Sequence, residues 1–267
     1  MVGSPLAAAD VRRGLPFATG VGIRRGAPAA PLGSHLTPLA PLSARGEGAR
    51  VQTPEDGEGG SFPAVGGGLY PEEEALLGPN ATARRRFYFA LGRAAARDAL
   101  AELGVGPVAI RRGPAGEPVW PPGVVGAITH TGDLAVAVVG WQTDYAGLGV
   151  DLERLSPGLS SRAERLVCTP AERAWIGDGV QASRGTMLFS AKEAVFKALF
   201  PIEHIWLGFS DAELTWQPER CAFDARLLKR ASSAYPAGAV LQVQCTLTDA
   251  EVLCTTHALP GGSPILR

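Results

Sequence analysis

Residues 147–153 read GLGVDLE, and this short stretch is the strongest structural signal in the sequence. Because side chains alternate between the two faces of a β-strand, Leu148, Val150 and Leu152 are predicted to share one face. Asp151 and Glu153 then share the other face, with their Cα atoms about 7 Å apart. From that spacing both carboxylates could reach one hard cation such as magnesium, although an ordinary strand with a solvated acidic face has the same pattern.

A helix predicted over residues 186–199 contains the run LFSAKEAVFK and carries a second polar cluster. Spacings of three and four residues place Ser190, Glu193 and Lys197 on one face of this helix. Glu193 and Lys197 form a favourable i, i+4 pair, so a surface ion pair would explain them. They would equally suit a third metal carboxylate and a lysine that binds a phosphate, as phosphoryl transfer requires.

The segments around these two elements favour an α+β fold. Helices are predicted from Pro71, from Asn80 as N-cap to Gly104, and from a capping box at residues 169–172, and Pro201 is expected to stop the helix that begins at residue 186. Strands are predicted at residues 124–129, 134–139, 148–153, 213–216, 222–227, 240–247 and 251–258. Helices packed on sequentially paired strands indicate an antiparallel α+β arrangement, and no Gly-rich phosphate loop or dinucleotide-binding motif is present.

Composition excludes several classes of protein. The chain has 267 residues, of which 46% are hydrophobic and 19% charged, as in globular proteins. Its longest apolar run, residues 134–139, is far shorter than the ~18 residues of a membrane span. With a net charge of -1 it offers no basic field for nucleic acid, so an anionic ligand needs a local cluster. The four cysteines and four histidines show no zinc-ligand spacing or disulfide framework, and a reducing cytoplasm is the expected location.

Residues 1–60 are rich in Gly, Pro, Ala and Arg and show almost no apolar periodicity. We expect a disordered extension, or translation from an upstream start codon, because such a stretch buries too little surface to offset its ordering entropy. A transit peptide is an alternative, but serine is scarce and no amphipathic helix is apparent. The regions of a secretory signal peptide are missing.

Basic residues before the acidic strand have two interpretations. His130 ends a predicted strand beside a turn, where a histidine is ordinarily a turn residue. Arg86, Arg93 and Arg97 share a face of the helix that Asn80 opens. Such a row is typical of a solvated surface, but arginine side chains on a rigid helix also suit a phosphate monoester.

Taken in order, these features resemble the 4'-phosphopantetheinyl transferases, in the monomeric two-lobed branch that includes enterobactin synthetase component D. The resemblance runs from about Phe62 to Gly208. It rests on the arginine helix at 84–93, GEPVWP at 116–121, GAITH at 126–130, GVDLE at 149–153, FSAKEAVFKA at 189–198 and WLGF at 206–209. It implies an α+β fold of two similar lobes, each an antiparallel sheet packed with a helix, at residues 61–144 and 145–267, although no internal repeat is apparent in the sequence.

The resemblance implies a transferase of the holo-[acyl-carrier-protein] synthase type (EC 2.7.8.7). Such an enzyme moves the phosphopantetheine arm of coenzyme A to a serine of an apo carrier protein and releases adenosine 3',5'-bisphosphate. Magnesium is expected on Asp151, Glu153 and Glu193, with Glu193 as the base and Lys197 steadying the leaving group. Coenzyme A is expected to contact Arg85, Arg93, Arg112, Thr129, His130, Asp151, Lys192 and Lys197.

Ala115 departs from the family pattern, because many relatives carry a basic residue there, and Arg112 is expected to take over that phosphate contact. Two other functions stay open from the residues. A metal-dependent phosphodiesterase or pyrophosphatase could use the same carboxylates, and a silent module could bind only coenzyme A or a carrier. The expected partners are apo acyl, peptidyl or aryl carrier domains of siderophore, polyketide or nonribosomal-peptide biosynthesis, with no nucleic acid or membrane, and the branch suggests a monomer.

Overall fold

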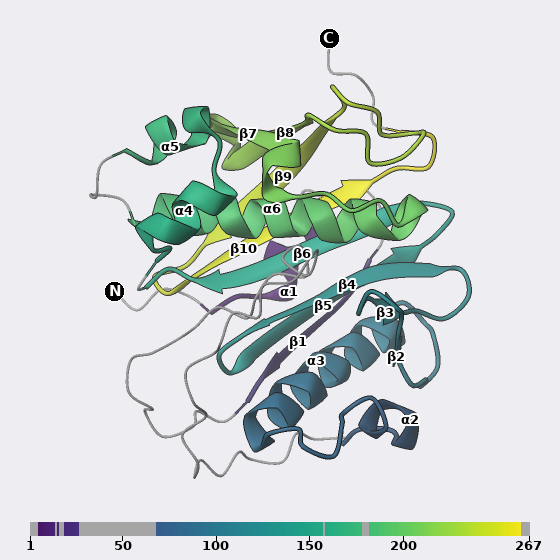
Figure 1. The fold of residues 1–267 in the computed structure, drawn as a ribbon. Coiled ribbons are helices and arrows are strands. Elements are labelled where there is room, and N and C mark those ends of the chain that lie inside the picture. The colour runs from purple at the N-terminus through teal and green to yellow at the C-terminus, as the bar shows by residue number, and fades with distance from the viewer. Residues whose placement is uncertain are drawn as a thin grey trace.

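Two antiparallel sheets, each packed against one long helix, make up most of the described structure (Figure 1). The computed structural model describes residues 5–13, 15, 19–26, 68–156, 158–177 and 182–262. The α+β class with two helix-covered antiparallel sheets, expected from the sequence, is confirmed. Among these residues no helix is both long and apolar enough to cross a membrane.

The first sheet has the strand order β1-β5-β4, with β1 (Gly20–Arg25), β5 (Leu134–Trp141) and β4 (Val124–Thr131). β4 and β5 form the predicted hairpin, with Thr131 paired to Leu134 across its turn. Helix α3 (Ala83–Glu102) packs on β1 and β5. The smaller elements of this half are α1 (Ala8–Arg12), α2 (Pro71–Glu74), β2 (Arg111–Arg112) and β3 (Pro118–Val119).

The start of α3 differs from the expectation by two residues. Thr82, not Asn80, is the N-cap, because Thr82 Oγ1 accepts a hydrogen bond from the Arg85 N–H at 3.2 Å. A cap satisfies a free N–H two or three residues after it, and Asn80 lies too early to do so.

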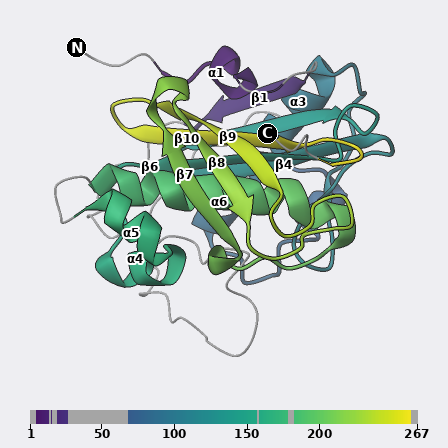
Figure 2. The same cartoon turned by 90° about the horizontal axis from the view of Figure 1, so that it is seen from above.

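The second sheet has the strand order β6-β10-β9-β8-β7 and begins after residues 142–146. Its strands are β6 (Gly147–Arg154), β7 (Ala212–Gln217), β8 (Ala222–Leu227), β9 (Val240–Leu247) and β10 (Glu251–Ala258). Helix α6 (Ala182–Glu203) packs across this sheet, while α4 (Ser161–Val167) and α5 (Pro170–Ile176) gather at one end of α6 (Figures 1 and 2). Two 3-10 turns, η2 (Phe209–Asp211) and η3 (Pro218–Arg220), flank β7.

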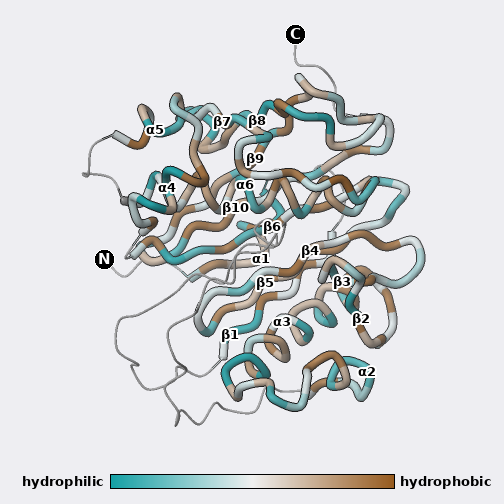
Figure 3. Tube along the Cα trace, in the orientation of Figure 1, coloured by the Kyte–Doolittle hydropathy of each residue, from teal (hydrophilic) through white to brown (hydrophobic). Residues whose placement is uncertain are grey.

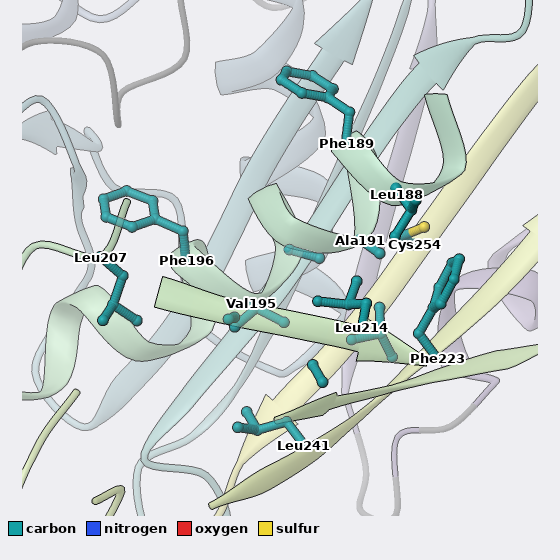
Figure 4. Close-up of a cluster of buried hydrophobic side chains, with 14 of the residues drawn as sticks. Leu188, Phe189, Ala191, Val195, Phe196, Leu207, Leu214, Phe223, Leu241 and Cys254 are labelled. Carbon is teal, nitrogen blue, oxygen red and sulfur yellow. The ribbon is translucent and has the colours of Figure 1, made fainter. Parts of the chain in front are cut away.

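The larger core lies between α6 and the second sheet. Leu188, Val195 and Leu199, predicted as the packing face of the helix, are at most 2% exposed. Figure 4 shows side chains of α6 beside residues of the strands, among them Leu214, Phe223 and Cys254. Brown, hydrophobic segments run along β4, β5 and α6 in Figure 3.

Helix α6 continues past Pro201, which was expected to end it, and stops only at Glu203. Proline lacks the N–H that would donate to the carbonyl of Lys197, but in the last helical turn this removes only one hydrogen bond. The extension matters because Phe200 and Pro201 both line the main pocket.

The expectation of a disordered segment over residues 1–60 is wrong for residues 8–12 and 20–25, which form α1 and β1. β1 completes the first sheet, pairing antiparallel with β5 from Gly20 opposite Val139 to Arg25 opposite Leu134. The pattern of apolar residues does not predict this strand, because glycines instead of large apolar residues face α3. A Cβ on Gly20 or Gly22 would clash with the backbone carbonyls of α3. Residues 27–60 lie outside the described residues.

The two halves repeat one packing arrangement. Gly20 and Gly22 of β1 lie against the Ala99 and Ala95 carbonyls of α3, as Gly147 and Gly149 of β6 lie against those of Ala198 and Ala194 in α6. Two residues further along each strand, Arg24 pairs with Asp98 of α3, and Asp151 pairs with Lys197 of α6. The repeat that the sequence did not reveal is therefore present in three dimensions, with the charges of its ion pair exchanged.

Candidate active site

Asp151 lies in the middle of β6, where β6 runs beside β4 of the other sheet. Its side chain is buried, and Oδ1 accepts hydrogen bonds from Lys197 Nζ at 2.6 Å and from Thr129 Oγ1 at 3.1 Å. Oδ2 is also buried but has no hydrogen-bond partner within the described part of the chain. Because a buried carboxylate oxygen without a partner is costly, this atom marks a position where a cation or a donor would be stabilised.

Lys197 faces Asp151 because Gly147 and Gly149 let β6 approach α6 so closely. Its Nζ also donates to the carbonyl of Val150 at 3.2 Å. Burial by itself would lower the pKa of Lys197, but the carboxylates of Asp151, Glu193 and Glu153 outweigh it and raise that pKa. Lys197 therefore stays a fixed positive charge at the junction of the two sheets.

Glu153 and Glu193 complete the acidic group. Burial, together with the negative charges of Asp151 and Glu193, raises the pKa of Glu153 to about 8, although Lys197 opposes the shift. Glu193 itself is buried. The three acids therefore lie close enough to influence one another's charge, yet within the described ranges no three Asp, Glu, His or Cys side chains converge closely enough to hold a metal ion. The expected carboxylate triangle is not closed in this structure.

Arg93 of α3 is the buried cation of the first half. Its guanidinium lies 4.4 Å from the centre of the Phe89 ring, and its buried Nε has no hydrogen-bond partner among the described residues. Burial lowers the pKa of Arg93 to about 10; Glu73 opposes this shift, and Arg112 adds to it. At neutral pH the group still carries its charge, so the site holds a desolvated cation with an unused donor.

His130 stacks on Tyr88, with ring centres 5.2 Å apart and the planes inclined by 21°. Burial and the charge of Lys197 together lower the pKa of His130 to about 4, although Asp151 opposes the shift. The imidazole is therefore neutral at pH 7. A neutral imidazole adds no positive charge to the site, but it can donate one hydrogen bond.

A pocket of about 230 Å³ opens between β4 and the C-terminal half of α6. Lys197 lies on its wall, and the remaining lining is mainly apolar, including the aromatic residues Trp120, Phe196, Phe200 and Trp206. Ala115, where a basic residue was expected, also lines it. The pocket thus offers an apolar chamber with a charged end beside Asp151, suited to a ligand with one apolar and one anionic part.

Comparison with known proteins agrees with this arrangement. Residues 72–140 match the 4'-phosphopantetheinyl transferase N-terminal domain, and residues 147–244 match the 4'-phosphopantetheinyl transferase superfamily. The chain is 39% identical over 166 residues to the 4'-phosphopantetheinyl transferase PptT of Mycobacterium tuberculosis, covering 61% of this chain and 73% of that protein. The chain belongs to the 4'-phosphopantetheinyl transferase family.

Two further relatives extend the comparison. The 4'-phosphopantetheinyl transferase Svp of Streptomyces mobaraensis is 41% identical over 165 residues, which cover 60% of this chain and 66% of Svp. Enterobactin synthase component D of Escherichia coli strain K12 is 38% identical over 118 residues, which cover 43% of this chain and 55% of that protein. The chain is thus a transferase of the class that attaches phosphopantetheine to carrier proteins.

The structure brings most of the predicted site residues of the transferase together, but not all of them. Thr129 uses its hydroxyl twice, donating to Asp151 and accepting from the Leu152 N–H at 3.2 Å, so it positions Asp151. Arg85 lies exposed in the first turn of α3, about two helical turns before Arg93. Lys192 is buried on another face of α6 and does not reach the site.

Sequence reasoning missed two groups of residues in the transferase. The aromatic pocket lining was missed because Trp120, Phe196, Phe200 and Trp206 come from separate segments. Glu172 was assigned only to a capping box, which the structure confirms: Thr169 Oγ1 accepts from the Glu172 N–H at 3.3 Å and Glu172 Oε2 accepts from the Thr169 N–H at 2.7 Å. The same carboxylate also binds Lys192, and no sequence spacing indicates that contact.

Proposed function

We propose that the chain transfers the 4'-phosphopantetheine group of coenzyme A to a serine hydroxyl of an apo carrier protein, with magnesium bound by Asp151, Glu153 and Glu193. Adenosine 3',5'-bisphosphate is the second product. The observation that supports this most directly is Asp151 Oδ2, which has no hydrogen-bond partner among the residues that the structure describes and lies beside Lys197 on the wall of the pocket.

The donor set suits magnesium. Three carboxyl groups lie near one ammonium, and the raised pKa of Glu153 reflects its burial together with repulsion from Asp151 and Glu193. A divalent cation would relieve that repulsion, and magnesium typically takes a few carboxylates together with substrate phosphates. When bound, it would offset the negative charge on the diphosphate as the bond to the leaving phosphate opens.

The protein's own cations would orient the phosphates of coenzyme A. Arg93 supplies a desolvated guanidinium whose Nε–H has no partner in the described part of the chain, and Arg112 lies within electrostatic reach of it. Neutral His130 would donate one hydrogen bond to a phosphate oxygen. Arg85 would approach from the exposed start of α3. The apolar pocket beside Lys197 would receive an uncharged part of the coenzyme, which fixes the diphosphate relative to Asp151.

Glu193 would act as the general base, and Lys197 would stabilise the leaving group. Glu193 is buried and lies one helical turn before Lys197, and its carboxylate would accept the proton of the serine hydroxyl. The Lys197 ammonium would stabilise the charge that develops on the leaving phosphate.

Mass spectrometry of an apo carrier protein incubated with coenzyme A and magnesium tests the proposal. The expected result is a mass gain equal to phosphopantetheine, which disappears with EDTA and with Asp151→Asn. Cleavage of coenzyme A without modification of the carrier would indicate a phosphodiesterase or pyrophosphatase. Binding of coenzyme A without any reaction, across acyl, peptidyl and aryl carriers, would indicate a binding module.

A further inference from the structure

Lys192 has all of its hydrogen-bonding capacity occupied inside the protein. Its Nζ donates to the Val167 carbonyl at 2.8 Å, to Glu172 Oε2 at 2.7 Å and to the Phe209 carbonyl at 2.7 Å. An ammonium has three N–H donors, so none is left for a phosphate. Both charged side chains are almost completely buried, with 2% exposure for Lys192 and 1% for Glu172.

Glu172 extends these contacts to two further segments. Its Oε1 accepts from the Leu214 N–H at 2.8 Å, and Oε2 also accepts from the Thr169 N–H at 2.7 Å. The pair therefore joins α6 to the end of α4, the start of α5, η2 and β7. We call these two residues, Lys192 and Glu172, the buried clamp.

The buried clamp holds segments that border Glu193. Successive residues of a helix point about 100° apart, so Lys192 and Glu193 project from adjacent sides of α6. Lys192, Glu193 and Phe209 line one small hollow beside the helix. The Phe209 ring also lies 5.7 Å from that of Phe189. Loss of the clamp would release η2 beside the proposed base, and would free the end of α4 from α6.

An apolar side chain would not replace Lys192. The carbonyls of Val167 and Phe209 need donors, and without the ammonium both would be left without this partner. Glu172 would also become a buried, uncompensated charge. The clamp therefore sets the positions of α4 and η2 through directional bonds, which hydrophobic packing does not supply.

We infer that Lys192 is a positioning residue for the transfer reaction, not a ligand of coenzyme A. Through Glu172 it holds α4, α5 and η2 against α6, and so shapes the surface from which the serine of a carrier protein approaches Glu193. The inference rests on the proposed function, because it takes Glu193 as the base.

The test compares Lys192→Met with the double variant Lys192→Met/Glu172→Gln, which restores charge neutrality and provides a folded protein if the single variant fails to fold. In both, kcat should fall by roughly 10- to 100-fold, since a displacement of about 1 Å can cost that much. The KM for the carrier should rise, while the Kd for coenzyme A, measured by calorimetry without carrier, should not change. Arg220→Met is the control. That partly exposed guanidinium pairs with Asp224 at 2.9 Å in the η3–β8 segment, so its loss should leave all three values unchanged.

Two results would overturn the inference. A weakened Kd for coenzyme A, as expected for Arg93→Ala, would make Lys192 a ligand after all. An unchanged kcat in either folded variant would leave the clamp without a positioning role. Failure of the wild-type protein to modify any apo carrier would instead refute the proposed function, and the calorimetry would still show whether Lys192 binds the coenzyme.

Discussion

Gly149→Ala is the substitution that most directly tests how the active site is assembled. Gly149 is on β6, two residues before Asp151, and faces the helix that carries Glu193 and Lys197. A Cβ at this position would lie 1.9 Å from the carbonyl oxygen of Ala194 in α6. Because that oxygen belongs to the backbone, no side-chain rotation can relieve the clash, and β6 and α6 must move apart.

The size of the movement follows from ordinary contact distances. A carbon and a carbonyl oxygen approach to about 3.3 Å, so the two elements must separate by ~1.4 Å. Added to the 2.6 Å between Lys197 Nζ and Asp151 Oδ1, this gives ~4 Å, beyond hydrogen-bonding distance. Overpacking of this kind costs about 1–3 kcal/mol of unfolding free energy, and misplaced catalytic groups cost roughly 100-fold in rate.

Gly22→Ala provides the matched control. A Cβ there would lie 1.8 Å from the Ala95 carbonyl of α3, so the steric change is the same, but β1 carries none of the proposed catalytic residues. The assay measures kcat at saturating coenzyme A and carrier, alongside unfolding by denaturant. Both variants should lose similar stability, and only Gly149→Ala should lose kcat. Equal losses of kcat, or a destabilised Gly149→Ala with wild-type kcat, would refute the reasoning.

Three further predictions follow from the described contacts. Deleting residues 1–26 should prevent stable folding, because it removes β1 and the buried side chains of Leu6, Val11 and Val21. Burial of these three side chains contributes roughly 5–9 kcal/mol at most to the free energy of unfolding. A truncated protein that is folded by circular dichroism and active in the transfer assay would contradict this. The pKa of His130 is about 4 in the folded protein and about 6.5 in the unfolded chain, so between these pH values only the unfolded chain binds the proton. As the pH falls through this window, the free energy of unfolding should therefore drop by up to about 3 kcal/mol. Denaturant titrations across that window should show a smaller loss for His130→Gln, and equal slopes would exclude the effect. Arg93→Ala should raise the KM for coenzyme A more than it lowers kcat, since it removes a phosphate contact; an unchanged KM in steady-state kinetics would remove Arg93 from the binding site.

Local chemistry in the sequence was sufficient to predict the individual elements. The alternation of residues 147–153 predicted β6 and the shared face of Asp151 and Glu153, and the spacing of Glu193 and Lys197 predicted their common helix face. These patterns depend only on the periods of strands and helices. The order of the motifs then indicated the family, which the comparisons confirm.

Contacts between distant segments could not be predicted in this way. The assignment of Lys192 to coenzyme A failed because the residue adjoins Glu193 in sequence, whereas its three acceptors come from α4, α5 and η2. β1 was missed for a related reason. Its glycines are needed because β1 packs directly against the backbone carbonyls of α3, about 75 residues further along the chain.

The sequence by itself determined which residues are chemically capable of the reaction and which element carries each of them, because strand and helix periods are local. Only the tertiary structure decided which of those residues meet. Asp151 contacts Lys197 because two glycines let β6 pack directly against α6. Lys192 does not reach the active site, because its three N–H groups donate to a buried carboxylate and two carbonyls. Burial keeps His130 neutral and the neighbouring carboxylates keep Lys197 positive, and both effects exist only once the chain has folded.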